Sequence, residues 1–567
     1  MKIERYFTGV SLLVLGLLLL QCAGQLPPGG GPVDTTPPTV IRTSPDTNAT
    51  RVQTRTIELE FSKYVDRRSL EESIFISPYL GELEFDWSGT EVAIGFSDSL
   101  RKNTTYVVNI GTDVTDLRGR NRMANGFTLA FATGDSIDKG FIGGRIFDEK
   151  AEGVMIFAYL LQGINPDTLN PGHIRPEYIM QTGRDGSFLL SRLLLGTYRV
   201  FAVRDEFRNL VYDKEVDAFG VARGDIALTS AHPKMSDIWF RLSKEDTTRP
   251  FLASVTAQDR FRMQVRFSEP IDTLTFSRAL FAVSDTMGRK QVPVMLAYLF
   301  RGNEALAGLM TATPLDSAMY RLTVANVRDR SGNSIDPTHS SVVFEGSNAP
   351  DTLKPRFTVA ALRDSARGYP LEEPIDINFS EPVNRTSAAA GITLKDSTGK
   401  PVDAVQRWYG PTDFGIVPRR PLLSKAWYRI VIRLDSVVDL AGNRYKDSTF
   451  TLRFQTLDLR STGMIAGTVT DERQEVQRGP IYLTASSVDA TPIRQQTLRM
   501  ERSGKFSFDR LVEGKYVLSA YIDADSSGTY SFGSPSPFLP SERFAVYPDT
   551  EKVRARWAVE GMSVKFK

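Results

Sequence analysis

A short acidic loop near the C-terminus has the residue types and spacing that could bind calcium. The segment Asp523-Ala-Asp-Ser-Ser-Gly528 offers side-chain oxygens at its first, third and fifth positions and glycine at its sixth. A twelve-residue calcium loop has this pattern but ends in a glutamate, and here the twelfth residue is Ser534. The sequence therefore leaves two interpretations open: calcium bound at Asp523 and Asp525, or a polar turn without an ion. The corresponding segment 205–209 has a different pattern, which favours the turn.

Residues for acid–base or nucleophilic catalysis are scarce. The chain has three histidines, His173, His232 and His339, and none has metal-protease spacing. The one cysteine, Cys22, offers no free thiol once it is lipidated. Paired carboxylates could serve glycoside hydrolysis, but small repeated sandwiches seldom form a deep cleft. We expect no enzymatic activity and no cofactor.

One aromatic pair could bind a carbohydrate. Trp408 and Tyr409 precede Gly410, and flat aromatic faces can stack on sugar rings. The alternative is that the pair packs into a domain core. Burial is the expectation that we favour.

The N-terminus predicts export and lipid anchoring. An apolar run, Gly9 to Leu20, follows a charged start and ends at Cys22, and it is too short to span a membrane. With Leu19 three residues before the cysteine, the segment resembles a bacterial lipoprotein signal, although Gln21 replaces the usual small residue. That resemblance implies an outer-membrane lipoprotein with Cys22 as its lipidated first residue, anchored by several acyl chains. Both the periplasmic and the outer face of the membrane stay open.

Charge balance limits the range of partners. Without Lys2, Glu4 and Arg5 the chain has 67 basic and 66 acidic residues. Neither nucleic acid nor an anionic surface is therefore implied as a partner. A single cysteine also allows no disulfide within the chain, so each domain must be stabilised by buried apolar surface.

Three segments of about 100 residues repeat one pattern of strands. Each begins with an Asp-Thr segment that leads to a proline, continues in an alternating strand that ends in Phe-Ser, and later has a Tyr-led strand and an aspartate turn. Period two places the alternating residues on one face of each strand. We expect the turn aspartates to accept backbone N–H bonds and not to bind metal. The motifs are Ile57-Leu59-Phe61, Met263-Val265-Phe267 and Ile375-Ile377-Phe379, then Tyr106, Tyr320 and Tyr428, then Asp116, Asp329 and Asp439.

These repeats predict β-sandwiches. Phe-Ser-Glu-Pro, found at 267–270 and 379–382, with a Tyr-led strand and Asp-x-x-Gly-Asn, is similar to bacterial Ig-like domains of the S-layer-protein type. The first repeat departs from this pattern, since it reads Phe-Ser-Lys-Tyr at 61–64. The resemblance implies architecture and a place among surface or envelope proteins, but no shared ligand.

Two further segments match each other and not the Ig-like repeats. Each has Gly-x-Phe, at 186–188 and 504–506, followed ten residues later by Gly-x-Tyr, at 196–198 and 514–516. Glycine at each turn with an aromatic residue two positions later predicts a hairpin. The pattern resembles the carboxypeptidase-regulatory-like or transthyretin-like β-sandwich, which implies a fold that accompanies enzymes or transporters without doing chemistry itself. We call these segments the Gly-x-Tyr modules.

The predicted chain is all β, with five sandwiches in tandem. We expect a non-enzymatic, lipid-anchored envelope protein that displays its sandwiches for binding, adhesion or scaffolding. Its expected partners are the membrane, through Cys22, and an envelope protein or a glycan. The alternative is an accessory module that positions a polysaccharide or protein substrate for a separate enzyme. A calcium-stabilised adhesin is a third class. The segments are 1–21 (lipoprotein signal peptide), 22–36 (Gly/Pro-rich linker), 37–135 (Ig-like copy 1), 139–246 (first Gly-x-Tyr module), 247–347 (copy 2), 350–457 (copy 3) and 460–567 (second Gly-x-Tyr module).

Overall fold

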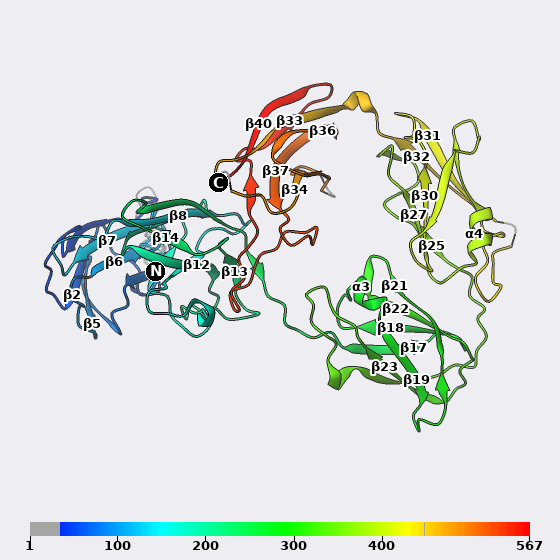
Figure 1. Cartoon of the computed structure of the whole chain (residues 1–567), viewed down its shortest axis with the longest axis horizontal. Coiled ribbons are helices and arrows are strands. Elements are labelled where there is room, and N and C mark those ends of the chain that lie inside the picture. The colour runs from blue at the N-terminus through cyan, green and yellow to red at the C-terminus, as the bar shows by residue number, and fades with distance from the viewer. Residues whose placement is uncertain (1–33, 447, 474, 491–492) are drawn as a thin grey trace, which may run out of the picture. The chain divides into compact units, whose positions relative to one another are not determined.

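The computed structural model describes residues 34–446, 448–473, 475–490 and 493–567 (Figure 1). The predicted signal peptide and Cys22 lie outside these residues. Within them the chain forms ten β-sheets, and it divides into two compact units, one largely of residues 34–243 and one largely of residues 244–567. The prediction of an all-β tandem array of sandwiches is confirmed. No helix in the described part of the chain has both the length and the hydropathy of a membrane-spanning helix.

The three Ig-like copies share seven corresponding strands, and copies 2 and 3 each add one edge strand at a different place. Each pairs a four-stranded sheet with a second sheet of three or four strands, and a short helix follows the Phe-Ser strand. Copy 1 has sheets β1-β2-β5-β4 and β3-β6-β7, copy 2 has β17-β18-β22-β21 and β20-β19-β23-β24, and copy 3 has β25-β27-β30-β29 and β26-β32-β31-β28. In copy 1 the elements are β1 (Val40–Ser44), β2 (Thr56–Phe61), α2 (Arg67–Glu71), β3 (Ile74–Ser77), β4 (Leu83–Ser88), β5 (Glu91–Phe96), β6 (Thr105–Ile110) and β7 (Phe127–Ala132).

Copies 2 and 3 have the corresponding elements in the second unit. Those of copy 2 are β17 (Leu252–Ala257), β18 (Arg262–Phe267), α3 (Thr273–Phe276), β19 (Leu280–Asp285), β20 (Gln291–Val292), β21 (Val294–Phe300), β22 (Asn303–Thr311), β23 (Met319–Ala325), η2 (Pro337–His339) and β24 (Ser341–Glu345). Those of copy 3 are β25 (Phe357–Val359), β26 (Ala366–Tyr369), β27 (Ile375–Phe379), α4 (Arg385–Gly391), β28 (Ile392–Asp396), β29 (Ala404–Trp408), β30 (Asp413–Pro418), β31 (Trp427–Arg433), β32 (Thr449–Thr456) and η3 (Leu459–Ser461).

The two Gly-x-Tyr modules share a different topology. A three-stranded sheet, β11-β8-β15 or β36-β33-β40, contains one parallel pair. It accompanies a second sheet, in the order β10-β9-β12-β13-β16 with β14 also paired to β12, or β35-β34-β37-β38 with β39 also paired to β37. The first has β8 (Gly140–Ile146), β9 (Met155–Leu160), η1 (Pro166–Thr168), β10 (Tyr178–Gln181), β11 (Ser187–Leu193), β12 (Gly196–Arg204), β13 (Ala218–Val221), β14 (Ile226–Leu228), β15 (Lys234–Phe240) and β16 (Ser243–Lys244). The second has β33 (Thr462–Asp471), β34 (Ile481–Ser487), β35 (Gln495–Met500), β36 (Gly504–Val512), β37 (Gly514–Ile522), β38 (Phe544–Val546), β39 (Glu551–Val553) and β40 (Ala558–Phe566).

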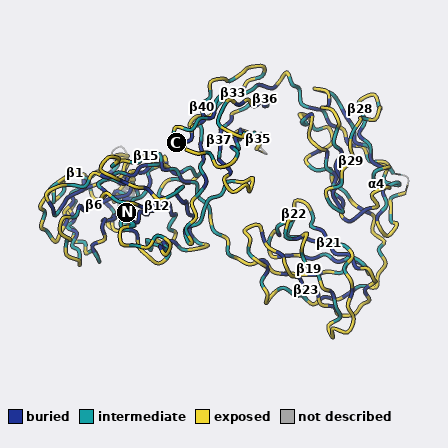
Figure 2. Tube along the Cα trace, viewed as in Figure 1, coloured by how far each residue is buried: buried dark blue, intermediate teal, exposed yellow. Residues whose placement is uncertain are grey.

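Each sandwich has its own hydrophobic core. The alternating residues of the three Phe-Ser strands are all buried, as period two predicts, and the loops carry most of the exposed positions (Figure 2). The strand-leading tyrosines Tyr106 and Tyr428 are buried, and their hydroxyls accept backbone N–H bonds from the residue five positions earlier, at 2.8 and 3.0 Å. These bonds satisfy a polar group that burial would otherwise leave unpaired.

Candidate cation-binding sites

Three groups of carboxylates lie close enough to hold a metal ion. In each group one oxygen from every residue lies within 4.8 Å of the others. All three groups belong to the second unit. They are Asp246, Glu269 and Asp329 in copy 2, Asp351, Glu381 and Asp439 in copy 3, and Asp523, Asp525 and Glu542 in the second Gly-x-Tyr module.

The calcium loop predicted from the sequence contains the third group. Asp523 and Asp525 lie together as the spacing indicates, and Glu542, which the sequence interpretation missed, joins them from just before β38. Both oxygens of Asp523 accept backbone N–H bonds, from Ser527 at 3.0 Å and Gly528 at 3.1 Å. Both oxygens of Glu542 also accept backbone N–H bonds, at 2.6 and 3.0 Å. These carboxylates therefore already hold the loop, which is the turn interpretation.

Hydrogen bonding lowers the pKa values of the carboxylates in this group, and burial raises them. Bonds from Ser531 and Ser527 lower the pKa of Asp525 to about 2. Burial raises the pKa of Glu542, although two backbone N–H bonds partly oppose it. Asp525 is thus the exposed member of the group, and hydrogen bonding keeps its carboxylate ionised.

The corresponding loop of the first Gly-x-Tyr module supports a structural role for these acids. Asp205, directly after β12, accepts backbone N–H bonds from Asn209 and Leu210 at 3.2 and 2.8 Å. Asp217, directly before β13, is buried and accepts backbone N–H bonds from Glu206 and Asp213. The same pair of positions therefore holds the loop in both modules.

The aspartate turns of the Ig-like copies form as predicted. Asp329 accepts bonds from the backbone N–H and the side-chain Nδ2 of Asn333, at 2.8 and 2.9 Å. Asp439 does the same with Asn443, at 2.7 and 2.9 Å. Asp116 accepts from Gly119 N and from the side chain of Asn121. These turns also bring the aspartates next to the chain that leads into each copy, which the sequence interpretation missed.

The aromatic pair does not present a shared flat face. The Trp408 ring packs against Phe379 and Phe414, with centroids 6.3 and 5.1 Å away, and Arg385 lies over it. Tyr409 is exposed, and the guanidinium of Arg301 lies 5.2 Å from its centroid. Trp408 therefore adjoins the core of copy 3, and Tyr409 offers one ring alone.

The three histidines lie apart from the carboxylate groups. His173 and His232 lie in loops of the first Gly-x-Tyr module. His339 ends η2, where its Nδ1 lies 2.7 Å from Asp336 Oδ2. Asp336 is the N-terminal cap of η2 and His339 is the third residue of that helix, so the contact is local.

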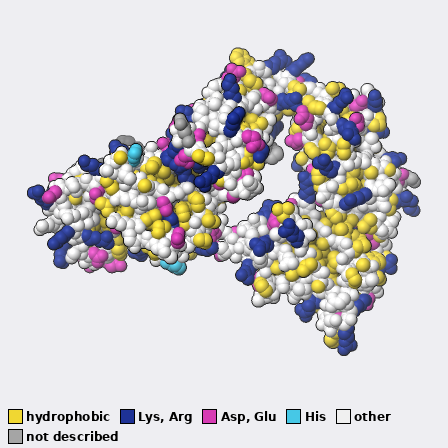
Figure 3. Space-filling model, viewed as in Figure 1, with side chains coloured by type: hydrophobic (Ala, Val, Ile, Leu, Met, Phe, Trp, Pro, Cys, Tyr) yellow, Lys and Arg dark blue, Asp and Glu magenta, His cyan; other side chains and the backbone are white. Residues whose placement is uncertain are grey.

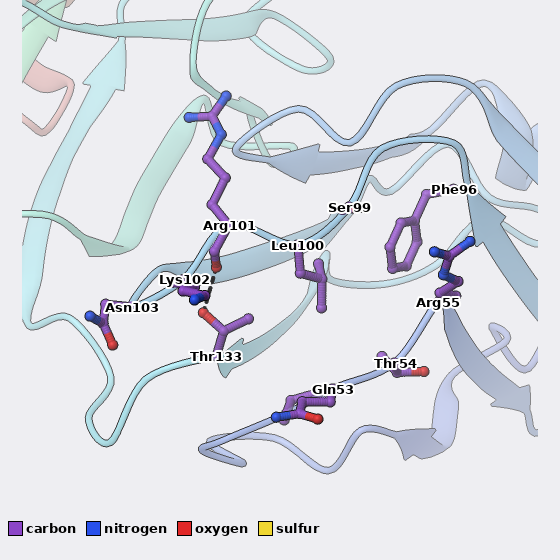
Figure 4. Close-up of a pocket in the computed structure, with 11 residues that line it drawn as sticks. Gln53, Thr54, Arg55, Phe96, Ser99, Leu100, Arg101, Lys102, Asn103 and Thr133 are labelled. Carbon is purple, nitrogen blue, oxygen red and sulfur yellow. Dashed lines mark hydrogen bonds between the residues drawn. The ribbon is translucent and has the colours of Figure 1, made fainter.

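An open pocket of about 670 Å³ lies in copy 1 (Figure 4). Its apolar part is formed by Phe96 and Leu100, and Arg55 lies beside Phe96 in the close-up. The Arg101 side chain extends away from these two residues and lies 3.5 Å from Glu177. Arg101 is thus paired with a carboxylate, whereas Arg55 and Lys102 also line the pocket.

Two segments of the chain match the family model of the bacterial Ig-like domain, at residues 34–133 and 351–456. These matches coincide with copies 1 and 3. Copy 2 has the same strand order without a match. No curated protein matches the sequence significantly.

Solved structures with detectable similarity are distant. The N-terminal part of the bacterial S-layer protein SbsC is 12% identical, with 36% of this chain and 44% of that chain covered and a TM-score of 0.17. L,D-transpeptidase 1 of Mycobacterium tuberculosis is 11% identical over 34% of this chain and 88% of its own, with a TM-score of 0.16. Alpha-2-macroglobulin of E. coli is 11% identical, covering 92% of this chain and 34% of its own, with a TM-score of 0.14. The chain thus spans less than half of the N-terminal SbsC chain.

Proposed function

We propose that the chain is a non-enzymatic, lipid-anchored protein of the cell envelope that uses its sandwiches as a stiff scaffold or spacer. The observation that carries this proposal is the way successive sandwiches join. In the first unit, copy 1 and the first Gly-x-Tyr module share buried polar bonds: Asn109 Nδ2 donates to Ile179 O at 2.9 Å, and Ile179 N donates to Ser77 Oγ at 3.1 Å. Buried, satisfied bonds of this kind fix orientation.

A second joint has a different chemistry. In the second unit Arg262, on β18 of copy 2, forms ion pairs with Asp259 of its own copy and with Asp351 and Glu381 of copy 3. All four side chains are largely buried. A guanidinium presents several donors in a fixed plane, so it holds carboxylates from two modules in one geometry. Stiff joints suit a protein that spaces or displays, because a flexible chain would not fix a distance.

The surface charge does not favour nucleic acid as a partner. On the face in Figure 3, basic side chains are spread over both units with acidic ones among them. The whole sequence has a formal net charge of only +2. No single extended basic face is therefore expected to bind a polyanion.

Anchoring through Cys22 is tested by cell fractionation. The wild type is expected in the membrane fraction and Cys22→Ala in the soluble fraction, because the acyl chains are the proposed anchor. Gln21→Ala, which restores a small residue before the cysteine, is the matched control and stays with the membrane. Membrane retention of Cys22→Ala would refute lipid anchoring.

Protease shaving of intact cells tests which side of the membrane the array faces. Loss of the second Gly-x-Tyr module from an immunoblot would place the array outside and favour adhesion or glycan capture. Protection until lysis would place it in the periplasm and favour a scaffold for an envelope partner. Cytoplasmic fractionation of the wild type would contradict the proposed function itself.

A further inference from the structure

A pocket of about 630 Å³ lies at the joint between copies 2 and 3, inside the second unit. Copy 2 contributes the face of its β17-β18-β22-β21 sheet that is turned away from its hydrophobic core. Copy 3 contributes the segment that leads into it, residues 352–356, and the loop between β31 and β32. Small-ligand sites of proteins are typically clefts of roughly 300–1,000 Å³ with a few convergent polar groups. We call this cleft the joint pocket.

The floor of the joint pocket is a row of three positions on adjacent strands. Gly308 of β22 pairs with Gln264 of β18 on one side and with Tyr298 of β21 on the other. The Tyr298 ring lies over Gly308, where a β-carbon would overlap it. Glycine therefore makes room for the tyrosine on the outer face of the sheet, away from the core.

Tyr298 is a buried residue whose hydroxyl has no partner among the described residues. It is 6% exposed, although it is not a member of the hydrophobic core of copy 2. No described residue hydrogen-bonds to its hydroxyl, and burial raises the pKa of Tyr298 while the charge of Arg262 opposes that rise. Buried hydroxyls are normally hydrogen-bonded, because an unpaired one costs free energy. The hydroxyl is therefore a ready donor and acceptor for a polar ligand.

Four other polar side chains of the joint pocket make no hydrogen bond or ion pair within the described parts of the chain. They are the amides of Gln258 and Gln264 and the cationic groups of Lys354 and Arg356. The acid that lines the pocket, Glu381, already pairs with Arg262. The joint pocket therefore has two positive charges that no carboxylate of the described structure neutralises.

Aromatic rings form the apolar walls of the joint pocket. Phe300 meets Tyr298 edge to face, with ring centroids 5.3 Å apart. Tyr445 lies on the side of copy 3, with Lys354 Nζ 5.0 Å from its centroid. Flat rings can stack on the apolar face of a sugar ring, whereas an aliphatic ligand would leave the amides and the cations unsatisfied. Rings, amides and unpaired cations together fit a saccharide that carries negative charge.

We propose that the joint pocket binds an acidic saccharide. Its hydroxyls bond to the Tyr298 hydroxyl and to the amides of Gln258 and Gln264. A sugar ring packs on the aromatic walls, and the sugar carboxylate pairs with Lys354 and Arg356. A guanidinium binds a carboxylate through two parallel hydrogen bonds, which makes Arg356 the main determinant of preference for an acidic sugar. This function goes beyond that of a spacer and requires no lipid anchor.

A saccharide in this pocket would touch both copies. Gln258, Gln264 and Tyr298 belong to copy 2, whereas Lys354 and Arg356 belong to the segment that enters copy 3. Because the pocket forms only when both copies are folded and joined, the ligand would stabilise their joint by mass action. The joint would then be stiffer with the saccharide bound.

Isothermal titration calorimetry on the full mature chain tests the proposal. The probes are trigalacturonate and a hyaluronan tetrasaccharide, titrated to about 10 mM, a range that detects millimolar affinity. At least one should bind to the wild type, and Arg356→Gln should bind it roughly tenfold more weakly, because a hydrogen bond to a charged group is lost. Arg266→Gln, which removes an exposed cation of β18 outside the pocket, is the matched control and should bind as the wild type does. Absence of binding by both probes, or equal affinity in the wild type and Arg356→Gln, would overturn the proposal.

Two further probes test the class of ligand. Maltotriose has sugar rings without a carboxylate, and triglutamate has carboxylates without sugar rings. Each should bind roughly tenfold more weakly than the acidic saccharide, because each satisfies only part of the pocket. Equal affinity for maltotriose would overturn the requirement for charge, and equal affinity for triglutamate would assign the pocket to acidic peptides instead.

A second variant guards against loss of folding. Tyr298→Phe removes the hydroxyl and keeps the ring over Gly308, so the circular dichroism spectrum should not change. Binding should weaken about threefold to tenfold, because one neutral hydrogen bond is lost. If Tyr298→Phe binds as tightly as the wild type, the hydroxyl does not contact the ligand and the assigned site is wrong. Cell fractionation tests the lipid anchor separately, so a failure to bind saccharide leaves the proposed function as it stands.

Discussion

Copies 1 and 2 share seven corresponding strands and an asparagine that donates to the turn aspartate, yet they differ in the sign of one side chain. Lys63 of copy 1 sits between two aspartates, whereas Glu269 at the same position in copy 2 adds a third carboxylate. Copy 1 thus carries a counter-charge at this position, and copy 2 has none there among the residues that the structure describes. The comparison shows that one residue after the Phe-Ser strand decides how a sandwich is stabilised at its junction without altering its fold.

The largest effect is expected from Arg262, because this arginine of copy 2 pairs with carboxylates of copy 3. Arg262→Met leaves Asp259, Asp351 and Glu381 without their shared partner, and removal of one member of a buried ion pair costs about 3–5 kcal/mol. Chemical denaturation should show copies 2 and 3 unfolding at a lower denaturant concentration. Arg262→Lys keeps the charge without the planar fork and should lie between the two. A Met variant as stable as the wild type would show that the joint does not depend on this arginine.

Reversing the charge in copy 1 should convert it to the arrangement of copy 2. Lys63→Glu places three carboxylates together, and repulsion should lower the melting temperature of copy 1 by roughly 5 °C. The measurement is differential scanning calorimetry. Lys63→Gln, which removes the cation without adding an acid, should show the smaller loss. Equal losses in the two variants would show that the added carboxylate causes no repulsion.

The converse change in copy 2 should give a smaller, stabilising effect. Glu269→Lys creates an ion pair in a half-exposed site, which is worth about 0.5–1 kcal/mol. At low ionic strength the variant should melt above the wild type, and at high ionic strength the difference should shrink, because salt screens exposed charges. Thermal melts of both proteins at each ionic strength measure this. Identical melting temperatures of the two proteins in both conditions would show that repulsion among the three carboxylates does not destabilise copy 2.

The smallest expected effect is a pH dependence of stability. Because burial and two aspartates raise the pKa of Glu269 in the folded state, the folded chain binds this proton more readily than the unfolded chain. The protonated form therefore contributes stability below the ordinary glutamate pKa, and that contribution is lost as pH rises through the raised pKa. Glu269→Gln should abolish this dependence, which calorimetry across this pH range can check.

Much of the fold was predictable because it rests on local patterns. Alternating Ile57, Leu59 and Phe61 predicts a one-sided strand, and all three are buried. The aspartate turns were predictable for the same reason, since Asp329 and Asn333 lie four residues apart and bond directly. The pairing of the two Gly-x-Tyr modules followed from equal spacing, and their strand orders agree.

The carboxylate groups around the turn aspartates were not predictable from local patterns, because their members are far apart in the chain. Asp246 and Asp329 meet only when the strands between them pair. Glu542 reaches the Asp523 loop in the same way, across a long connection before β38. One signal was present: the change from Phe-Ser-Glu to Phe-Ser-Lys in copy 1 marks the position where charge matters. The aspartates that face this position lie far from it in the sequence.

The most direct test of this account is hydrogen–deuterium exchange on the wild type and on the reciprocal double variant Lys63→Glu/Glu269→Lys. Relative to the wild type, the double variant should exchange faster in the segments around Asp34 and Asp116, because copy 1 loses its counter-charge. It should exchange more slowly around Asp246 and Asp329, because the counter-charge moves with the lysine. Exchange that is unchanged in both copies would contradict the claim that this one position determines how a sandwich is stabilised at its junction.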